Sequence, residues 1–278
     1  MGFLANSLNC KSLETKDSKA AFNQMVSTLE GLRPRQRSRN KVQDLDRSLN
    51  KETVGRLQKI TQESHEENPF SENVQLRNLL IIEILSGLGL RKGELANIRL
   101  DDINFQKNTL KVVRRPDDPS DPRRYQPLVK TSERTLPLHD QLSLCIQEYQ
   151  LNQRGKLNAA RKHGYLFVSH SGGTAGQPLS IAGIDYVFKR LKLALSDPSL
   201  SPHNLRHQWN YEFSHSIDSS DDRMSEAQED QLRSYLMGWC PTSGMASNYN
   251  RRRVVEKAHK AIEEHQRRLA RMKDNNDN

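Results

Sequence analysis

The sequence predicts a mainly α-helical protein with one small antiparallel β-sheet. Two observations lead to this fold class. Apolar residues recur at helical spacing over most of the chain, and the few strand-like segments lie around a single proline-rich loop, residues 116–122. The chain has 278 residues, which is enough for one large domain or two small ones with a hydrophobic core.

Residues 1–47 form a separate N-terminal region in this prediction. They are polar and contain one helical candidate, Ala20 to Leu32. A basic run follows at residues 33–41, with five positive charges in nine residues, and it either extends into solvent or follows phosphates. A helix N-cap candidate at residues 48–50 then opens a periodic stretch, so we place a second domain over residues 48–278.

The second domain is expected to begin with a buried helical core. Residues 74–85 are densely apolar, which indicates a central helix that ends at the Ser86-Gly87-Leu88-Gly89 segment. A short helix is expected from Arg91 to Ile98. Strands are expected over residues 108–114, 126–130 and 134–138, and together they form the small sheet.

Helices dominate the remainder of the chain. A short apolar strand is expected at Tyr165 to Ser169, and the acidic stretch from Ser219 to Asp230 is expected to be a surface loop. The helical candidates are residues 139–153, 180–195, 204–217, 230–238 and 252–272.

Charge and composition point to a polyanionic partner. Lys and Arg number 43 against 34 Asp and Glu, a net charge of +9, and the pI of about 9.5 makes nucleic acid the leading candidate. The mean hydropathy of −0.84 argues against a membrane-embedded protein. Cys10, Cys145 and Cys240 are odd in number and far apart, which fits neither a disulfide framework nor a paired zinc site and favours the cytoplasm.

Arg91 is the first candidate functional residue, because it opens the helix predicted at residues 91–98. A positive side chain is unfavourable at a helix N-terminus, which already carries partial positive charge, unless an anion binds there. Taken alone, a structural ion pair with Glu94 or Asp102 is the simpler account of this arginine.

A second group lies on one predicted helical turn, where Ser201-Pro202 favours a helix start. His203, Arg206 and His207 fall on neighbouring faces of that turn. Two histidines at this spacing can ligate zinc, but the metalloprotease pattern needs Glu beside the first histidine, and Asn204 stands there. We therefore expect no metal, and a histidine pair packed in the core is the simpler account of the motif alone.

Further along, Gly238-Trp239 ends a predicted helix, and Tyr249 precedes three consecutive arginines. In chain order the motifs Gly89 to Leu95 around Arg91, Lys130 ahead of Arg134 to Leu138, His203 to His207, Gly238-Trp239 and Tyr249 resemble the tyrosine recombinase (phage integrase) family. The active site of that family has Arg, Lys, His, Arg, His or Trp, and Tyr in this order. The resemblance covers roughly residues 48 to 260, and the concurrence of five motifs is far more specific than any one of them.

Two positions depart from the family pattern, because Gln208 stands where relatives usually carry Thr and Trp239 replaces the commoner His. The family also has a full helical core-binding domain ahead of the catalytic domain, and residues 1–47 are too short to form one. We therefore expect residues 1–47 to be an N-terminal helix and basic linker, the remnant of such a domain, and residues 48–278 to be the catalytic domain with a C-terminal helix.

The resemblance implies a role for each matched residue. Arg91 and Arg206 would clamp the nonbridging oxygens of a scissile DNA phosphate, a task that suits the guanidinium fork. Lys130 would protonate the leaving 5'-oxygen, and Tyr249 would attack and form a 3'-phosphotyrosyl bond. His203 would accept the tyrosine proton and Trp239 would pack and hydrogen-bond in the site, with Glu94 and His207 in support. No cofactor or metal is expected in this chemistry.

Further contacts are expected with DNA and between copies of the chain. The basic side chains expected to bind DNA phosphates are Arg35, Arg37, Arg39, Arg251, Arg252 and Arg253. Val255, Ala258, Ile262, His265, Leu269 and Met272 form an amphipathic stripe that either folds back onto its own domain or, as in the family, packs on a neighbouring protomer. We expect a homo-oligomer on a double-stranded recombination site, a tetrameric synapse, in the cytoplasm and associated with the nucleoid when bound.

The sequence thus predicts an integrase-type, site-specific DNA recombinase of a mobile genetic element. Two alternatives stay open. A type IB topoisomerase uses nearly the same residues to cut and reseal one strand. A non-catalytic DNA-binding regulator would explain the charge but not the set of Arg, Lys, His, Arg and Tyr.

Overall fold

The computed structural model describes residues 22–28, 49–219, 224–240, 244–246, 258–259 and 261–268. The chain divides into two units, Met1–Asp44 and Leu45–Asn278, and each is considered by itself. In the first unit residues 22–28 form a helix, inside the range predicted as 20–32. The predicted site residues that lie outside the described part of the chain are Arg35, Arg37, Arg39, Tyr249, Arg251, Arg252 and Arg253.

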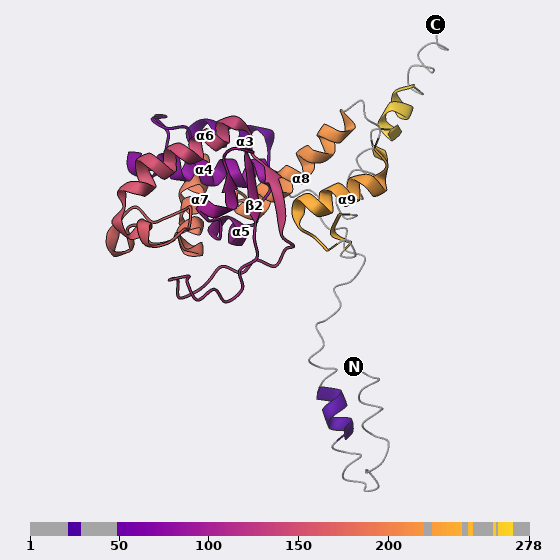
Figure 1. Cartoon of the computed structure of the whole chain (residues 1–278). Coiled ribbons are helices and arrows are strands. Elements are labelled where there is room, and N and C mark those ends of the chain that lie inside the picture. Colours follow the sequence, from indigo (N-terminus) through magenta and orange to yellow (C-terminus); the bar gives the residue numbers. More distant parts are fainter. Residues whose placement is uncertain are drawn as a thin grey trace. The chain divides into compact units, whose positions relative to one another are not determined.

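The second unit is mostly helical, as predicted (Figure 1). Its first helix begins where Asn50 caps the chain, with the side chain accepting a hydrogen bond from the Glu52 amide. The labelled helices are α3 (Lys51–Ile60), α4 (Glu72–Leu88), α5 (Lys92–Ala96), α6 (Asp140–Glu148), α7 (Ile181–Leu195), α8 (Pro202–Asp218) and α9 (Glu226–Met237), with short helices η1 (Leu100–Asp102) to η5 (Gly172–Thr174) between them. Residues 261–268 are helical as well, inside the range predicted as 252–272.

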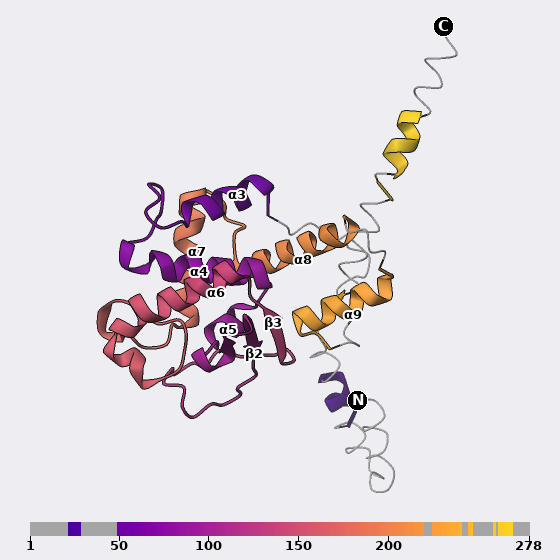
Figure 2. The same ribbon diagram turned by 45° about the horizontal axis from the view of Figure 1, so that its top comes forward.

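Helix α4 is the centre of the core, as its apolar sequence predicts. Leu80, Ile81 and Leu85 are fully buried, and α4 packs against α5, α6 and α8 (Figure 2). The helix ends at Gly89, whose φ of +59° is the left-handed conformation that favours glycine at a C-cap. The core therefore fixes the position of the segment that leads into Arg91.

The sheet has three antiparallel strands in the order β1–β2–β3, but one predicted strand is wrong. The strands are β1 (Ile103–Asn104), β2 (Thr109–Val112) and β3 (Arg134–Pro137), with Leu110 opposite Ile103 and Leu136. Residues 126–130 are not a strand. Pro127 has no amide hydrogen for a ladder, and its carbonyl accepts a hydrogen bond from the side chain of Asn97 instead.

Three other boundaries differ from the prediction. Residues 165–169 make only isolated bridges, Tyr165 with Arg99 and Val168 with Pro178. The helix predicted at 139–153 is α6 followed by a π-helical segment, Tyr149–Gln153. The acidic stretch predicted as a loop up to Asp230 already belongs to α9 from Glu226, because Ser225 caps that helix by accepting from the Gln228 amide.

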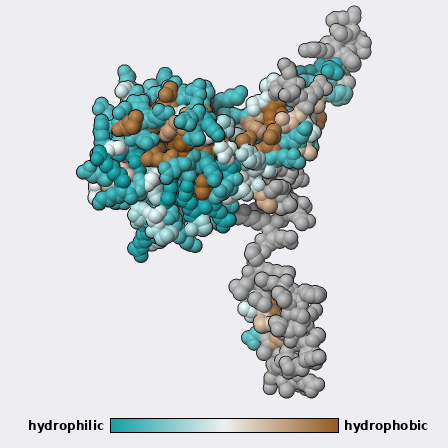
Figure 3. Space-filling model, in the orientation of Figure 1, coloured by the Kyte–Doolittle hydropathy of each residue, from teal (hydrophilic) through white to brown (hydrophobic). Residues whose placement is uncertain are grey.

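The surface of this unit is mainly polar. On the face seen in Figure 3, hydrophilic side chains cover most of the surface and apolar ones gather in a few patches. None of the helices in the described residues is long and apolar enough to cross a lipid bilayer.

Candidate active site

Arg91 stands at the N-terminus of α5, as predicted. It is the N-cap residue in an extended conformation, and its backbone amide donates to Glu94 Oε2 at 2.7 Å. Its side chain is half-buried. Asp102, which the sequence offered as an alternative partner, forms an ion pair with Arg115.

Glu94 is the buried centre of the site. Its side chain is 1% exposed and lies 3.8 Å from Arg206 Nη1, measured from Oε2. Thr131 donates its hydroxyl to Oε1, and Arg134 donates to both carboxylate oxygens at 3.0 and 3.1 Å. Burial alone would raise the pKa of Glu94, but these hydrogen bonds and the positive charges of Arg134 and Arg206 outweigh it and hold the pKa below its ordinary value.

Arg206 is anchored by the ends of two helices. Nη1 donates to the Gly89 carbonyl at 2.6 Å, and Nη2 donates to the Met237 carbonyl at 2.9 Å. These carbonyls lie at the C-terminal ends of α4 and α9, where the helix dipole favours a positive charge. The guanidinium also lies 5.6 Å from the ring centroid of Trp239, a cation–π distance. Arg206 therefore ties the segment that carries Arg91 to the segment that carries Trp239.

Lys130 is exposed, in the loop between β2 and β3. The residues after it are firmly held, because Ser132 donates its amide to the Gly238 carbonyl at 3.0 Å and Arg134 donates to the Leu236 carbonyl at 2.6 Å. A side chain at Gly238 would collide with this loop, since a Cβ there would lie 2.6 Å from Arg134 Nη1 and 2.9 Å from Thr131 Cβ. The turn after Lys130 thus packs directly on the end of α9.

His203 and His207 lie one turn apart near the start of α8, where Ser201 caps the helix. Their Nε2 atoms are 2.9 Å apart and their rings meet edge to face, with centroids 4.3 Å apart. A hydrogen bond between two imidazoles needs one of them to accept, so the contact requires at least one neutral ring. The described residues contain no group of three or more His, Cys, Asp or Glu that could hold a metal ion.

Trp239 is buried directly after α9, at 6% exposure. It packs in a small apolar cluster with Met237 and Ala246, bordered by Trp209 and Leu236. Ala246 precedes Tyr249 by three positions in the sequence.

The structure therefore joins four of the predicted site residues in one network of hydrogen bonds, ion pairs and ring contacts: Arg91, Glu94, Arg206 and Trp239. His203 belongs to the same turn as Arg206, and Lys130 to the loop held by Glu94. Thr131, Arg134 and Gly238 also belong to this site, although no sequence motif singled them out. Arg134 points to the same buried face of β3 as Leu136, and this position in the strand pattern is the signal that could have found it.

The chemistry of this arrangement suits a phosphate. Glu94 bonds to the Arg91 amide and lies beside the Arg206 guanidinium, and Lys130 is exposed in a loop held by the same carboxylate. The histidine pair lies on the same helix as Arg206. The buried carboxylate of Glu94 pairs with Arg134 and lies beside Arg206, so it holds both guanidinium groups in position.

Solved structures show the same fold. An XerH site-specific recombinase bound to a palindromic difH substrate superimposes with a TM-score of 0.55 at 16% identity, over 77% of this chain and 52% of that chain. The Tn1549 transposon integrase in complex with a circular intermediate DNA gives a TM-score of 0.52 at 16% identity, over 88% of this chain and 78% of that chain. The fold is thus that of a tyrosine recombinase catalytic domain.

Sequence comparison gives the family. Residues 47–218 match the phage integrase family, and the chain belongs to it. The tyrosine recombinase XerD of Halalkalibacterium halodurans is 27% identical over 158 residues, which are 56% of this chain and 46% of that protein. XerC of Pediococcus pentosaceus is 28% identical over 138 residues, 49% of this chain and 40% of that protein. The family match confirms the predicted resemblance. The aligned part spans less than half the length of these two relatives.

Proposed function

We propose that this protein is an integrase-type, site-specific DNA recombinase that cleaves and rejoins strands through a 3'-phosphotyrosyl intermediate. The observation that carries the proposal is the convergence of Arg91, Arg206 and the Lys130 loop on the buried carboxylate of Glu94, in a member of the phage integrase family. A regulator that only bound DNA would have no need of a lysine loop held by the same buried carboxylate that contacts two arginines.

Arg91 and Arg206 neutralise the scissile phosphate in this proposal. Attack on a phosphodiester gathers negative charge on the nonbridging oxygens, and guanidinium groups stay protonated throughout. The anchoring of Arg206 by the Gly89 and Met237 carbonyls supports this role, because a fixed donor needs little reorganisation as charge develops.

Tyr249 is the proposed nucleophile. Its phenolic oxygen forms a bond to phosphorus as the bond to the 5'-oxygen breaks, and the leaving oxygen takes a proton from Lys130. His203 accepts the tyrosine proton, and its contact with His207 supports this role because the pair needs a neutral ring. Trp239 packs against the Arg206 guanidinium and keeps it in place.

A suicide substrate tests the nucleophile. A DNA site with a nick beside the scissile phosphate releases a short fragment after cleavage and traps the covalent complex. Tyr249→Phe should bind this DNA like the original protein and give no adduct, because only the attacking oxygen is removed. Tyr235→Phe is the matched control, since the hydroxyl of this exposed tyrosine in α9 donates to the Thr135 carbonyl, and it should give the adduct. An adduct from Tyr249→Phe would overturn the proposal.

Recombination, as opposed to relaxation by a topoisomerase, requires exchange between two sites. Four-way junctions formed from paired sites, in the presence of EDTA, are the expected product, because the mechanism uses no divalent ion. Relaxation of supercoiled DNA without junctions would favour topoisomerase-like strand cutting and resealing.

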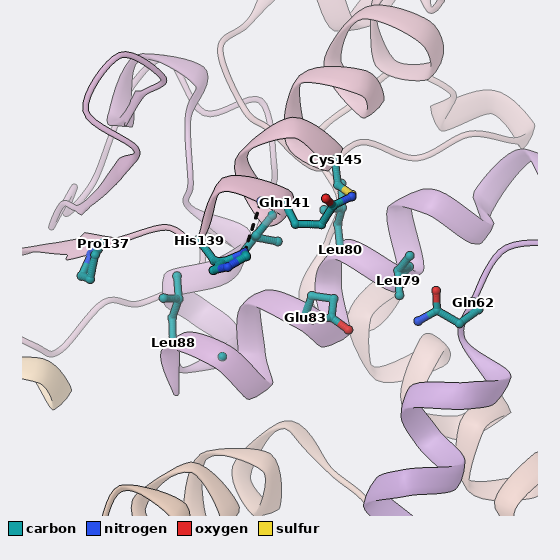
Figure 4. A pocket seen from close by; sticks show the side chains of 11 residues that line it. Gln62, Leu79, Leu80, Glu83, Leu88, Pro137, His139, Gln141 and Cys145 are labelled. Atoms are coloured by element: carbon teal, nitrogen blue, oxygen red, sulfur yellow. Dashed lines mark hydrogen bonds between the residues drawn. The ribbon is translucent and has the colours of Figure 1, made fainter. Parts of the chain in front are cut away.

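We further propose that copies of the chain assemble on DNA by exchanging the C-terminal segment, and that a groove between α4 and α6 receives it. The groove has a volume of about 550 Å³, and Figure 4 shows side chains of both helices lining it. Leu79, Leu88 and Leu142 give it an apolar lining.

Charge complementarity supports this occupant. Glu83 places a carboxyl group in the lining of the groove. Glu63 and Glu148 lie close enough to Cys145, another lining residue, to add to the effect of burial in raising the pKa of its thiol. The segment over residues 251–273 carries nine Lys and Arg against three Glu, and Ile262 within it is 55% exposed. A basic amphipathic segment is thus matched to an acidic, apolar groove.

A further inference from the structure

We propose that Asn97 is a positioning residue for Lys130, the general acid, and that Arg123 holds Asn97 in the required orientation. The inference rests on the proposed function, because it concerns how the leaving 5'-oxygen is protonated. It starts from the loop between β2 and β3, which carries Lys130 and is otherwise an irregular segment of about twenty residues.

Helix α5 holds this loop on both sides of Lys130. Before the lysine, Asn97 Nδ2 donates to the Pro127 carbonyl at 2.9 Å. After it, the Thr131 hydroxyl donates to Glu94. Glu94 and Asn97 are three positions apart, so they lie on the same side of one helical turn. The turn that begins with Arg91 therefore also sets where the backbone around Lys130 lies.

The close approach of α5 to the loop is visible at Gly93. A Cβ at this position would lie 2.6 Å from the Leu128 carbonyl oxygen, so only glycine permits the observed spacing. The exposed Leu128 side chain, at 73%, is not what holds the loop. The restraint on this side comes from the backbone of Pro127 and Leu128 against α5.

Arg123 fixes the amide of Asn97. Its Nη2 donates to Asn97 Oδ1 at 2.9 Å, which leaves the amide nitrogen to face Pro127. The other donors of Arg123 bond to Asp121 and to the carbonyls of Ala96 and Leu179, at 2.8 to 3.1 Å. The Arg123 side chain is 6% exposed, and the ring centroid of Tyr165 lies 4.4 Å from its guanidinium carbon.

This network matters for proton transfer because a lysine is a flexible donor. Its ammonium must reach the leaving oxygen while that oxygen departs, and small displacements of a catalytic group cost large factors in rate. The Lys130 side chain is exposed, so the precision comes from its backbone. The two hydrogen bonds that link Arg123 to Asn97 and Asn97 to Pro127 hold the backbone before Lys130. The hydrogen bond from Thr131 to Glu94 holds the backbone after it.

Asn97→Asp tests the proposal with the smallest change of shape. The carboxylate keeps an acceptor for Arg123, so the buried guanidinium stays paired, but it lacks the donor to Pro127 and places an oxygen against that carbonyl. The full chain is used, and urea unfolding verifies that the variant is folded. Asn158→Asp, an exposed position in η4, is the control for the added charge, and Arg124→Gln, an exposed neighbour of Arg123, controls for charge removal in the loop.

The readout compares cleavage of an ordinary phosphodiester with cleavage of a 5'-bridging phosphorothiolate, whose thiolate leaves without protonation. We expect Asn97→Asp to cleave the ordinary substrate about 10- to 100-fold more slowly, less than the roughly 10²- to 10⁴-fold that a general acid contributes. On the phosphorothiolate it should match the original protein, as Lys130→Ala should. Arg91→Ala should stay slow on both substrates.

The outcomes separate this inference from the proposed function. If Lys130→Ala is not rescued by the phosphorothiolate, the assignment of the general acid itself is wrong. If Lys130→Ala is rescued but Asn97→Asp is equally slow on both substrates, Asn97 only stabilises the fold and the inference is overturned. An Asn97→Asp variant as fast as the control on the ordinary substrate would overturn it as well.

Discussion

Arg134 donates to both carboxylate oxygens of Glu94, with Nη1 3.0 Å from Oε1 and Nη2 3.1 Å from Oε2. Each side chain is only 1% exposed, so this is a fully buried, bidentate ion pair. Its partners come from α5 and from the first residue of β3. The pair therefore joins the arginine end of the site to the lysine loop, and its removal would affect both.

Glu94→Gln should destabilise the protein by about 3–5 kcal/mol, because it leaves the buried guanidinium of Arg134 without its counter-charge. Urea unfolding at neutral pH measures this change. Glu133→Gln is the control, since Glu133 pairs with Lys111 across 3.8 Å at the surface and its removal should cost about 0–1 kcal/mol. Similar destabilisation by the two variants would contradict the central role of Glu94.

The ion pair between Glu94 and Arg134 should also make the free energy of unfolding depend on pH in the acidic range. The folded-state pKa of Glu94 lies below the value of an unfolded carboxyl, so the stability it provides is present above that unfolded value, about 4.3. It is lost as the pH falls through the folded-state pKa. Glu94→Gln should therefore lose less stability than the original protein when the pH is lowered from 5 towards 3, as urea titrations at each pH would show.

Gly238→Ala should reduce both stability and cleavage. The position has a φ of +63°, and the added Cβ would meet Arg134, Thr131 and the Ser132 carbonyl. Gly172→Ala is the matched control, because its φ is +70° and nothing lies within 4 Å of an added Cβ. Both variants carry the backbone strain of roughly 1–2 kcal/mol, but Gly238→Ala should lose about 1–3 kcal/mol more through overpacking. Equal melting temperatures would show that the loop adapts.

The helices could be predicted closely from the sequence because their signals are local. Apolar spacing and a capping serine place α7 within a residue of the predicted range. The strand predicted at 126–130 is wrong for the opposite reason, since the backbone of Pro127 bonds to the side chain of Asn97, a contact thirty residues away in the chain. Pro127 is a local signal against a strand, but no local pattern reveals the tertiary hydrogen bond that replaces the ladder.

In the candidate site, too, some residues could be predicted from local motifs and others are set by tertiary contacts. Arg91, Glu94, Arg206 and Trp239 could be named in advance, because each stands in a short motif, and the structure connects them. The contacts that hold them come from Arg134, from Thr131 and from the Gly89 and Met237 carbonyls. Main-chain carbonyls carry no sequence signature, so which of them anchor Arg206 is decided only by the packing of α4, α8 and α9.

Because of His170, the free energy of unfolding should decrease as the pH is lowered from 6.5 to 4. Burial, with the nearby charge of Arg77, lowers the pKa of this histidine to about 4, and its ring stacks on Tyr149. The unfolded chain, with a pKa near 6.5, then binds more protons than the folded one in this window, so acid favours unfolding. The slope is at most about 1.4 kcal/mol per pH unit, and less because the ring is partly exposed. Urea unfolding of His170→Gln should show a shallower slope.

The basic linker should determine part of the salt dependence of DNA binding. Replacing Arg35, Arg37 and Arg39 with Gln should reduce the slope of log K against log salt by about 0.9 for each phosphate that is no longer neutralised. The slope is measured from the binding constant for a single half-site at salt concentrations of roughly 50 to 200 mM. A triple change of the exposed Lys156, Arg161 and Lys162 removes the same charge and should leave the slope as it was. If the linker variant keeps the original slope, the linker is a solvated spacer.

Removal of residues 256–278 should abolish cooperative assembly on a paired site while binding to one half-site persists, because the proposed groove between α4 and α6 then has no occupant. Gel mobility shifts on single and paired sites separate the two. If truncation instead unfolds the protein in urea, the segment packs on its own domain. Burial of Ile262 and Leu269 at roughly 1.5–3 kcal/mol each is large beside the 5–15 kcal/mol, roughly, of a whole domain.

Mixing two inactive proteins decides whether the segment is exchanged. The truncated protein keeps Tyr249 and an empty groove, and Tyr249→Phe supplies the segment, so the mixture should regain cleavage. Glu83→Lys in the truncated protein should prevent this recovery, because it repels the basic segment at the receiving groove. The same Glu83→Lys change placed in the Tyr249→Phe protein should leave recovery intact, since that groove is not the one that must be filled. Failure of recovery in both arrangements would show that Glu83 acts on folding and not on docking.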